Sequence, residues 1–402
     1  MKTRRWLLVW AALASMSIPG TASAGKNYPP GVSDSEIRIG QTLPYSGPAS
    51  VYSTIGKAEA AYFRMVNEQG GVNGRKLVLM SLDDGYLPPR TVEQTRKLIE
   101  QEGVLLIFGT FGTAPNAAVQ RYLNERGVPQ LFPVSGASRW GDPDHFPWTM
   151  GFQPTYRIEA AVIARYLLQA KPNAKIAVLS EDDDFGRDYL GGLKTALGDK
   201  AAKMIVGEAT YEGSDPTVDS QIVMLQASGA DVFVDVSIAK FTAQAIRKAY
   251  DIGWKPLYFV FSGATARAAV LEPAGLEKSR GLMSVQFAKD PTDPRWQDDR
   301  ATQEWRAWMA RYYADGDPAN SFNVAGYNWA MALVQVLKQC GDDLSRENVM
   351  RQAAHLDVEL PMLLPGIRLH TGPKQFFPIR EMQLKRFNGA VWESFGEVIR
   401  AE

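Results

Sequence analysis

Cysteine and histidine are nearly absent from the 402-residue sequence, which has one Cys, Cys340, and three His residues. A single cysteine cannot form an intramolecular disulfide, so the stability of the fold has to come from a buried core. The three His residues lie far apart, without the spacing of a zinc site, and no G-x-S-x-G, H-E-x-x-H or Walker motif occurs. The sequence therefore predicts no metal, no cofactor and no catalytic residues.

The sequence also lacks an excess of basic residues and, beyond its beginning, long apolar runs. Its 44 basic and 44 acidic residues cancel, which argues against a nucleic-acid partner. The nine-residue apolar run Trp6 to Ala14 is far shorter than the roughly 20 residues that span a bilayer. Three basic residues precede it and Ala22-Ser23-Ala24 follows, so residues 1–24 are expected to be a signal peptide cleaved after Ala24.

Export through this signal would give a soluble periplasmic protein. The Sec and twin-arginine routes both stay open. The mature chain would have 402 − 24 = 378 residues and a net charge of 41 − 44 = −3, because the signal contains three of the 44 basic residues and none of the acidic ones. A chain of that length is too long for one compact core, which indicates two domains.

Two series of alternating strands and helices follow one another along the chain. The first runs from residue 36 to residue 134, and the second begins after Gln153-Pro154 and ends near Phe261. This alternation predicts an α/β fold with two doubly wound lobes. In the second series a strand is expected over residues 202–206. Near the end, Asn388-Gly389 predicts the turn of a closing hairpin.

Aromatic residues crowd the stretch from Trp296 to Tyr313 at helical spacing. Such rows are more often core than ligand platforms, and we expect a core role for them here. Cys340 ends an apolar helical pattern, so it is expected to be a buried structural cysteine rather than a reactive one.

Three motifs in combination resemble the leucine/isoleucine/valine-binding family of periplasmic proteins. They are a strand at Ile37 to Gly40, then Ser46-Gly47-Pro48, and then Gly70-Gly71-Val72-Asn73-Gly74-Arg75. The similarity continues through Asp184-Phe185-Gly186 and Gly229-Ala230-Asp231-Val232 and covers nearly the whole mature chain. It implies a type I periplasmic binding protein, in which two lobes are joined by a three-segment hinge and close on a ligand.

The resemblance also implies a ligand site. Tyr52 falls where the family has a tyrosine that covers the ligand, and Thr113 falls where a hydroxyl and a backbone N–H hold the ligand carboxylate. Gly136, Ala137 and Ser138 match a second loop that contacts the ligand. Thr113 and Ser138 both follow predicted strands, and Pro115 opens a helix whose first N–H groups favour an anion.

The second lobe departs from the family pattern at two positions. Phe185 stands where the family often has a tyrosine, and Ala264 stands at or next to the acid that meets the ammonium group of amino-acid ligands. A buried ammonium group without a counter-charge costs several kcal/mol, although Asp184 could supply one. An aromatic or other hydrophobic carboxylate is therefore the expected ligand, with a branched-chain amino acid next.

The resemblance thus implies a monomeric substrate-binding protein that delivers its ligand to the permease subunits of an ABC transporter. Residues 25–151 and 288–360 are expected to form lobe 1, and residues 152–287 and 361–402 lobe 2. The chain should cross between the lobes near 151–153, 284–287 and 360–365. A ligand-presenting sensory protein, or a secreted enzyme on the same scaffold, remains the alternative.

Overall fold

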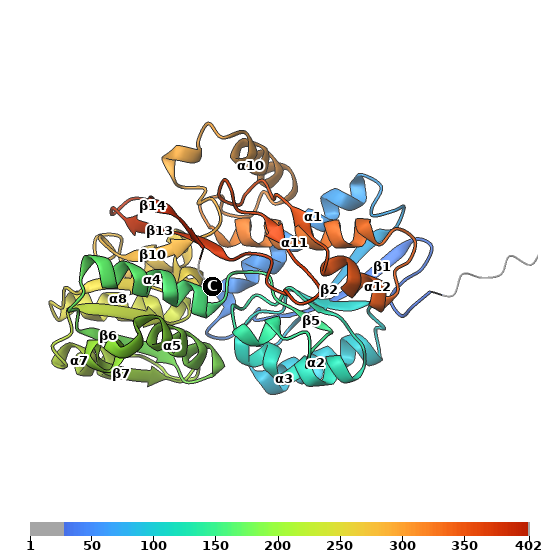
Figure 1. The fold of residues 1–402 in the computed structure, drawn as a ribbon. Helices are drawn as coiled ribbons and strands as arrows, with labels where there is room; N and C mark the ends of the chain where they lie inside the picture. The colour runs from blue at the N-terminus through green and yellow to red at the C-terminus, as the bar shows by residue number, and fades with distance from the viewer. Residues whose placement is uncertain (1–27, 401–402) are drawn as a thin grey trace, which may run out of the picture.

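The computed structural model describes residues 28–400, so the expected signal peptide lies outside the described part of the chain. Two α/β lobes lie side by side, each built on its own sheet (Figure 1). Within the described residues, no helix combines the length and the apolar character needed to cross a membrane.

Five parallel strands form the sheet of the first lobe, in the order β2-β1-β3-β4-β5. The central strand β3 is buried on both faces, as expected for the continuous apolar run in which it lies. The strands are β1 (Glu36–Leu43), β2 (Lys76–Asp83), β3 (Leu106–Phe108), β4 (Gln130–Leu131) and β5 (Thr149–Met150).

Helices from both ends of the sequence cover this sheet. A Cβ atom on Gly326 would lie 2.3 Å from the backbone oxygen of Ile55, so only glycine allows α1 and α11 to approach this closely. Trp305 and Trp308 are buried in the core, which confirms the structural role expected for them. The helices are α1 (Ser53–Glu68), α2 (Pro88–Glu100), α3 (Thr113–Glu125), α10 (Arg300–Tyr312), α11 (Phe322–Gln339) and α12 (Arg346–Ala353).

Seven strands form the second sheet, in the order β14-β13-β10-β9-β8-β6-β7. The last two strands of the sequence make an antiparallel hairpin that adds to β10, which confirms the predicted closing hairpin. The strands are β6 (Ile176–Glu181), β7 (Ile205–Tyr211), β8 (Val232–Val236), β9 (Leu257–Val260), β10 (Met283–Gln286), β13 (Glu381–Phe387) and β14 (Trp392–Arg400).

The helices of the second lobe differ from expectation in one place. The strand predicted over residues 202–206 begins only at Ile205, because Ala201–Met204 forms the short helix α6, in keeping with the high helix propensity of Ala, Lys and Met. The helices of this lobe are α4 (Tyr156–Ala170), α5 (Asp184–Leu197), α6, α7 (Asp219–Ala227), α8 (Ala239–Asp251) and α9 (Glu272–Ala274).

The chain passes between the lobes beside the contact of residues 287–289 with residues 362–364. The backbone N–H of Leu364 donates to the oxygen of Phe287 at 3.0 Å. After this contact the chain still lies beside the first lobe: β11 (Asp357–Val358) pairs with β12 (Leu369–His370), next to α12. It joins the second sheet at β13. The full assignment of residues to lobes stays a prediction.

Candidate functional site

A cavity lies between the two lobes, at the carboxyl ends of the parallel strands. The volume of the cavity is about 140 Å³. Residues that follow β1 and β3 line it from the first lobe, and residues that follow β6, β8 and β9 line it from the second. Open α/β sheets bind ligands at this edge, because the loops that can vary gather there.

Aromatic side chains form much of the cavity wall. In the first lobe, Tyr52 stacks on Phe111 with ring centroids 4.1 Å apart. In the second lobe, the centroids of Phe185 and Phe261 are 4.8 Å apart. An apolar or aromatic group would therefore be enclosed by rings from both sides. The aromatic residues on the wall are Tyr52, Tyr86, Phe111, Tyr156, Phe185, Phe261, Phe287, Phe322 and Trp329.

Three hydroxyl groups meet at one side of the cavity. The Oγ1 atom of Thr113 lies 2.8 Å from the Oγ of Ser135 and 3.0 Å from the Oη of Tyr156, and those two oxygens are 3.2 Å apart. The Oγ of Ser135 also accepts a hydrogen bond from the indole N–H of Trp140 at 3.0 Å. Burial raises the pKa of Tyr156, so this phenol stays protonated as a donor. Thr113 and Tyr156 belong to different lobes, so this cluster also joins the lobes.

Tyr52 bridges the cleft from the first lobe. Its hydroxyl donates to the backbone oxygen of Gly263 at 3.0 Å and accepts from the backbone N–H of Ala239 at 3.0 Å. Both partners belong to the second lobe, and the side chain of Tyr52 is buried. The two hydrogen bonds can form only when the lobes are together, so Tyr52 stabilises the closed arrangement.

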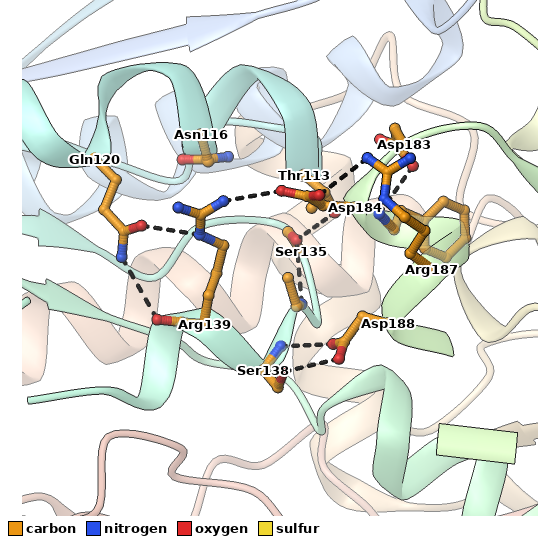
Figure 2. Close-up of polar contacts among 12 residues, drawn as sticks. Thr113, Asn116, Gln120, Ser135, Ser138, Arg139, Asp183, Asp184, Arg187 and Asp188 are labelled. Carbon is orange, nitrogen blue, oxygen red and sulfur yellow. Dashed lines mark hydrogen bonds and ion pairs between the residues drawn. The ribbon is translucent and has the colours of Figure 1, made fainter. Parts of the chain in front are cut away.

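The rim of the cleft is closed by charged contacts between the loop after β4 and α5 (Figure 2). The backbone N–H and the hydroxyl of Ser138 both donate to the carboxylate of Asp188, at 2.7 and 2.8 Å. Beside them, the guanidinium group of Arg139 donates to Asp184 at 2.9 Å. These contacts hold the second lobe against the first at the edge of the site.

The structure brings three of the seven predicted site residues to the cavity. Tyr52, Thr113 and Phe185 are among the residues that line it. Four others are not: the hydroxyl of Ser138 contacts Asp188 at the rim, and Gly136, Ala137 and Ala264 are not on the cavity wall. For Ser138 the reason is the conformation of its loop, because η2 (Ser138–Gly141) begins there and both its backbone N–H and its hydroxyl bind Asp188 on α5. Gly263 and Thr265, which flank Ala264, line the cavity instead.

Two acids lie near the site with their carboxylates engaged by protein groups. Glu159 on α4 accepts from the backbone N–H and the hydroxyl of Ser262 at 2.8 and 2.5 Å, which supports the loop after β9 from beneath. Burial raises the pKa of Glu159 to about 7. Asp184 contacts Arg139 and Arg187 and is not on the cavity wall, so the structure does not place it as a partner for a ligand ammonium group.

Polar residues that sequence reasoning missed also line the cavity. Tyr156 opens α4 directly after the first crossing, and Asn328 and Lys385 come from the last quarter of the chain. Asp290 is the one acid among the described lining residues, and its Oδ1 accepts two hydrogen bonds from Thr292. The position of Tyr156 after Gln153-Pro154 was a usable signal, whereas no local pattern marks the others.

Among the described residues, no cluster of three or more His, Cys, Asp or Glu side chains is placed to hold a metal ion. Cys340 is buried at the end of α11, as expected, and burial raises the pKa of its thiol to about 12.

Two α/β lobes that enclose an aromatic cavity define a two-lobed ligand-binding protein. Residues 36–389 match the family described as periplasmic binding protein, so the chain belongs to this family. It is similar to the Leu/Ile/Val-binding protein homolog 7 of Brucella suis biovar 1 (strain 1330), with 26% identity over 57% of this chain. That match spans only 59% of the length of homolog 7. Homolog 1 of Brucella abortus (strain 2308) is 24% identical over 78% of this chain and 81% of its own length.

Solved structures confirm the predicted type I fold. A branched chain amino acid ABC transporter protein from Thermus thermophilus with bound valine superposes with a TM-score of 0.82, at 15% identity over 92% of this chain and 98% of its own. A fatty acid ABC transporter substrate-binding protein from Thermomonospora curvata superposes with a TM-score of 0.79, at 19% identity over 94% of this chain and 95% of its own. At these identities the similarity establishes the fold alone.

Proposed function

We propose that the protein is the periplasmic solute-binding component of an ABC importer and captures a small carboxylate with an apolar, preferably aromatic, body. The cavity carries this proposal, because nine aromatic side chains line it and cross-lobe hydrogen bonds close it. The closed form would be the one that the membrane permease recognises. One structural neighbour is described as a fatty acid transporter protein, which fits an acid with an apolar body.

Burial of the ligand body supplies the main part of the expected affinity. An aromatic ring that loses about 150 Å² of exposed surface contributes about 4 kcal/mol at about 25 cal/mol per Å². Hydrogen bonds from the cavity to the acid group add to this and orient the ligand. A total binding free energy near −8 kcal/mol corresponds to a micromolar dissociation constant.

An amino-acid ligand is the second candidate. The loop after β9, which contains the buried Ala264, has no acid, and Glu159 and Asp184 are engaged by protein groups. Asp290 is the acid that an ammonium group in the cavity could still reach. The bound valine of the Thermus thermophilus neighbour keeps this class open as an alternative.

We expect benzoate- or cinnamate-type acids to bind more tightly than leucine, isoleucine or valine. The reason is that the rings of the cavity match an aromatic body, whereas the ammonium group of an amino acid has only Asp290 to pair with. Isothermal titration calorimetry of the purified full chain with both sets of compounds makes the comparison. Tight binding of leucine with no heat from any aromatic acid would contradict the ligand class. No binding of any carboxylate would contradict the function itself.

A second prediction concerns the rim. Ser138→Ala removes the hydroxyl that donates to Asp188, a hydrogen bond to a charged group at the partly exposed edge of the cleft. We expect closure to become less favourable by about 1.5 kcal/mol, which raises the dissociation constant about 10-fold. Calorimetry with the tightest acid of the panel measures the effect. Ser220→Ala, on the surface of α7, is the control and should bind like wild type. Equal affinities for all three proteins would show that the rim does not stabilise closure.

A further inference from the structure

The side chain of Lys385 is a buried cation on the cavity wall. It lies on β13, in the interior of the second sheet, and is only 4% exposed. Its Nζ donates to the Oγ1 of Thr265 at 2.9 Å and lies 4.6 Å from the ring centroid of Trp392. An ammonium group has three N–H donors, and the described residues supply only this one hydrogen-bond partner.

No carboxylate among residues 28–400 lies within 4 Å of this ammonium group. Buried charges are paired in folded proteins, because an isolated one loses its hydration without compensation. Burial lowers the pKa of Lys385 to about 8, and the negative charges of Asp290, Glu159 and Asp293 act against this shift. At neutral pH the cavity therefore contains a positive charge that lacks a contacting anion.

A second buried polar group on the cavity wall also lacks a partner. Asn328 on α11 is fully buried, and neither its amide nitrogen nor its amide oxygen has a hydrogen-bond partner among the described residues. Each such group costs about 1–3 kcal/mol when it stays unpaired. Asn328 and Lys385 come from different lobes, and both residues are among those that line the cavity.

The hydroxyl cluster at Thr113 is less suited to an anion. Its three hydroxyls have three hydrogens and make three contacts with one another, so the cluster can satisfy its own donors. A carboxylate accepts hydrogen bonds and cannot donate them, so it needs donors that are free. Lys385 and the amide nitrogen of Asn328 offer such donors on the cavity wall.

We propose that Lys385 binds the ligand carboxylate, with Asn328 as a second donor, so that the acid end of the ligand lies at the C-terminal hairpin rather than at Thr113. The inference rests on the proposed function and specifies how the site selects an anion. Lys385 would be the residue that distinguishes an acid from an uncharged molecule of the same shape. The aromatic rings of the two lobes then enclose the rest of the ligand.

The test compares cinnamate with cinnamamide, which has a similar shape and no charge. We expect wild type to prefer the acid by at least 10-fold in dissociation constant by calorimetry. In Lys385→Met the affinity for cinnamate should fall roughly 10- to 100-fold, as expected for the loss of a hydrogen bond to a charged group, while that for cinnamamide changes less than about 3-fold. Binding of the amide also shows that the variant is folded.

A matched control is Lys278→Met. Lys278 lies in the second lobe and is not on the cavity wall, and its Nζ pairs with Asp251 at 2.7 Å, so the preference for the acid should remain. Asn328→Asp places a negative charge on the opposite lobe and should weaken the binding of cinnamate at least 10-fold more than the binding of cinnamamide. This comparison tests the position of the ligand carboxylate if Lys385→Met does not fold.

The outcomes separate this inference from the proposed function. If wild type binds cinnamate and Lys385→Met keeps the preference for the acid, the assignment of Lys385 is wrong and the proposed function stands. If wild type binds no carboxylate at all, both are wrong. Loss of the preference in Lys385→Met, with the preference kept in Lys278→Met, supports the assignment.

Discussion

Replacing Tyr52 with phenylalanine should weaken ligand binding about 30-fold without changing the cavity wall. The ring would still stack on Phe111, but the hydrogen bonds to Gly263 and from Ala239 would be lost. The N–H of Ala239 would stay buried without a partner in the closed form. The closed state should therefore be destabilised by about 2 kcal/mol, since a buried polar group without a hydrogen-bond partner costs about 1–3 kcal/mol.

The measurement combines affinity with shape. Calorimetry with the tightest acid of the panel should give the higher dissociation constant. Small-angle scattering should show that ligand reduces the radius of gyration at a higher concentration than in wild type. Tyr45→Phe is the matched control, because the hydroxyl of Tyr45 contacts Ser81 in its own lobe at 2.7 Å and does not cross the cleft. If Tyr52→Phe behaves like Tyr45→Phe in both measurements, Tyr52 does not stabilise closure.

The alternation of strands and helices was enough to predict both lobes. A parallel strand buried on both faces, such as β3, is a continuous apolar run, and the helices carry amphipathic patterns. Tyr52, Thr113 and Phe185 could also be placed, because the family resemblance implies ligand contacts at their positions. These features depend on residues that are near one another in sequence.

The remaining polar lining could not be predicted in this way. Lys385 reaches the cavity because β13 pairs with β10, where its partner Ser284 lies 385 − 284 = 101 residues earlier. Locally it is a lysine in a strand with alternating apolar residues, a pattern that predicts exposure to solvent. Ser138 shows the reverse case: its position suggested a ligand contact, and the turn of its loop directs it to Asp188. Both outcomes depend on tertiary packing.

Glu181 is a buried acid at the end of β6 that links both lobes. Its Oε2 accepts from the phenol of Tyr86 in the first lobe and from that of Tyr211 in the second, each at 3.3 Å. No basic side chain among residues 28–400 forms an ion pair with it. Burial raises the pKa of Glu181, and the nearby charge of Asp183 raises it further. The closed fold therefore favours the protonated acid.

This raised pKa predicts how stability changes with pH. The unfolded chain releases the proton near the ordinary glutamic acid value of about 4.3, whereas the folded protein retains it to a higher pH. The contribution of Glu181 to stability is thus fully present below that ordinary value and is lost as pH rises toward the raised one, at about 1.4 kcal/mol per pH unit. Glu159 and Asp235, whose pKa values burial raises to about 7 and about 6, act in the same direction.

Glu181→Gln isolates the contribution of this residue. The glutamine stays neutral at every pH, and its carbonyl oxygen can accept both phenol hydrogen bonds. We expect the variant to match wild type near pH 5 and to exceed its free energy of unfolding by roughly 3 kcal/mol at pH 8, measured by urea denaturation across this range. Glu208→Gln, on the partly exposed strand β7, should show no such rise. A difference between Glu181→Gln and wild type that stays constant from pH 5 to pH 8 would mean that Glu181 is already ionised in the folded protein, and that its two phenol donors outweigh the cost of burying the charge.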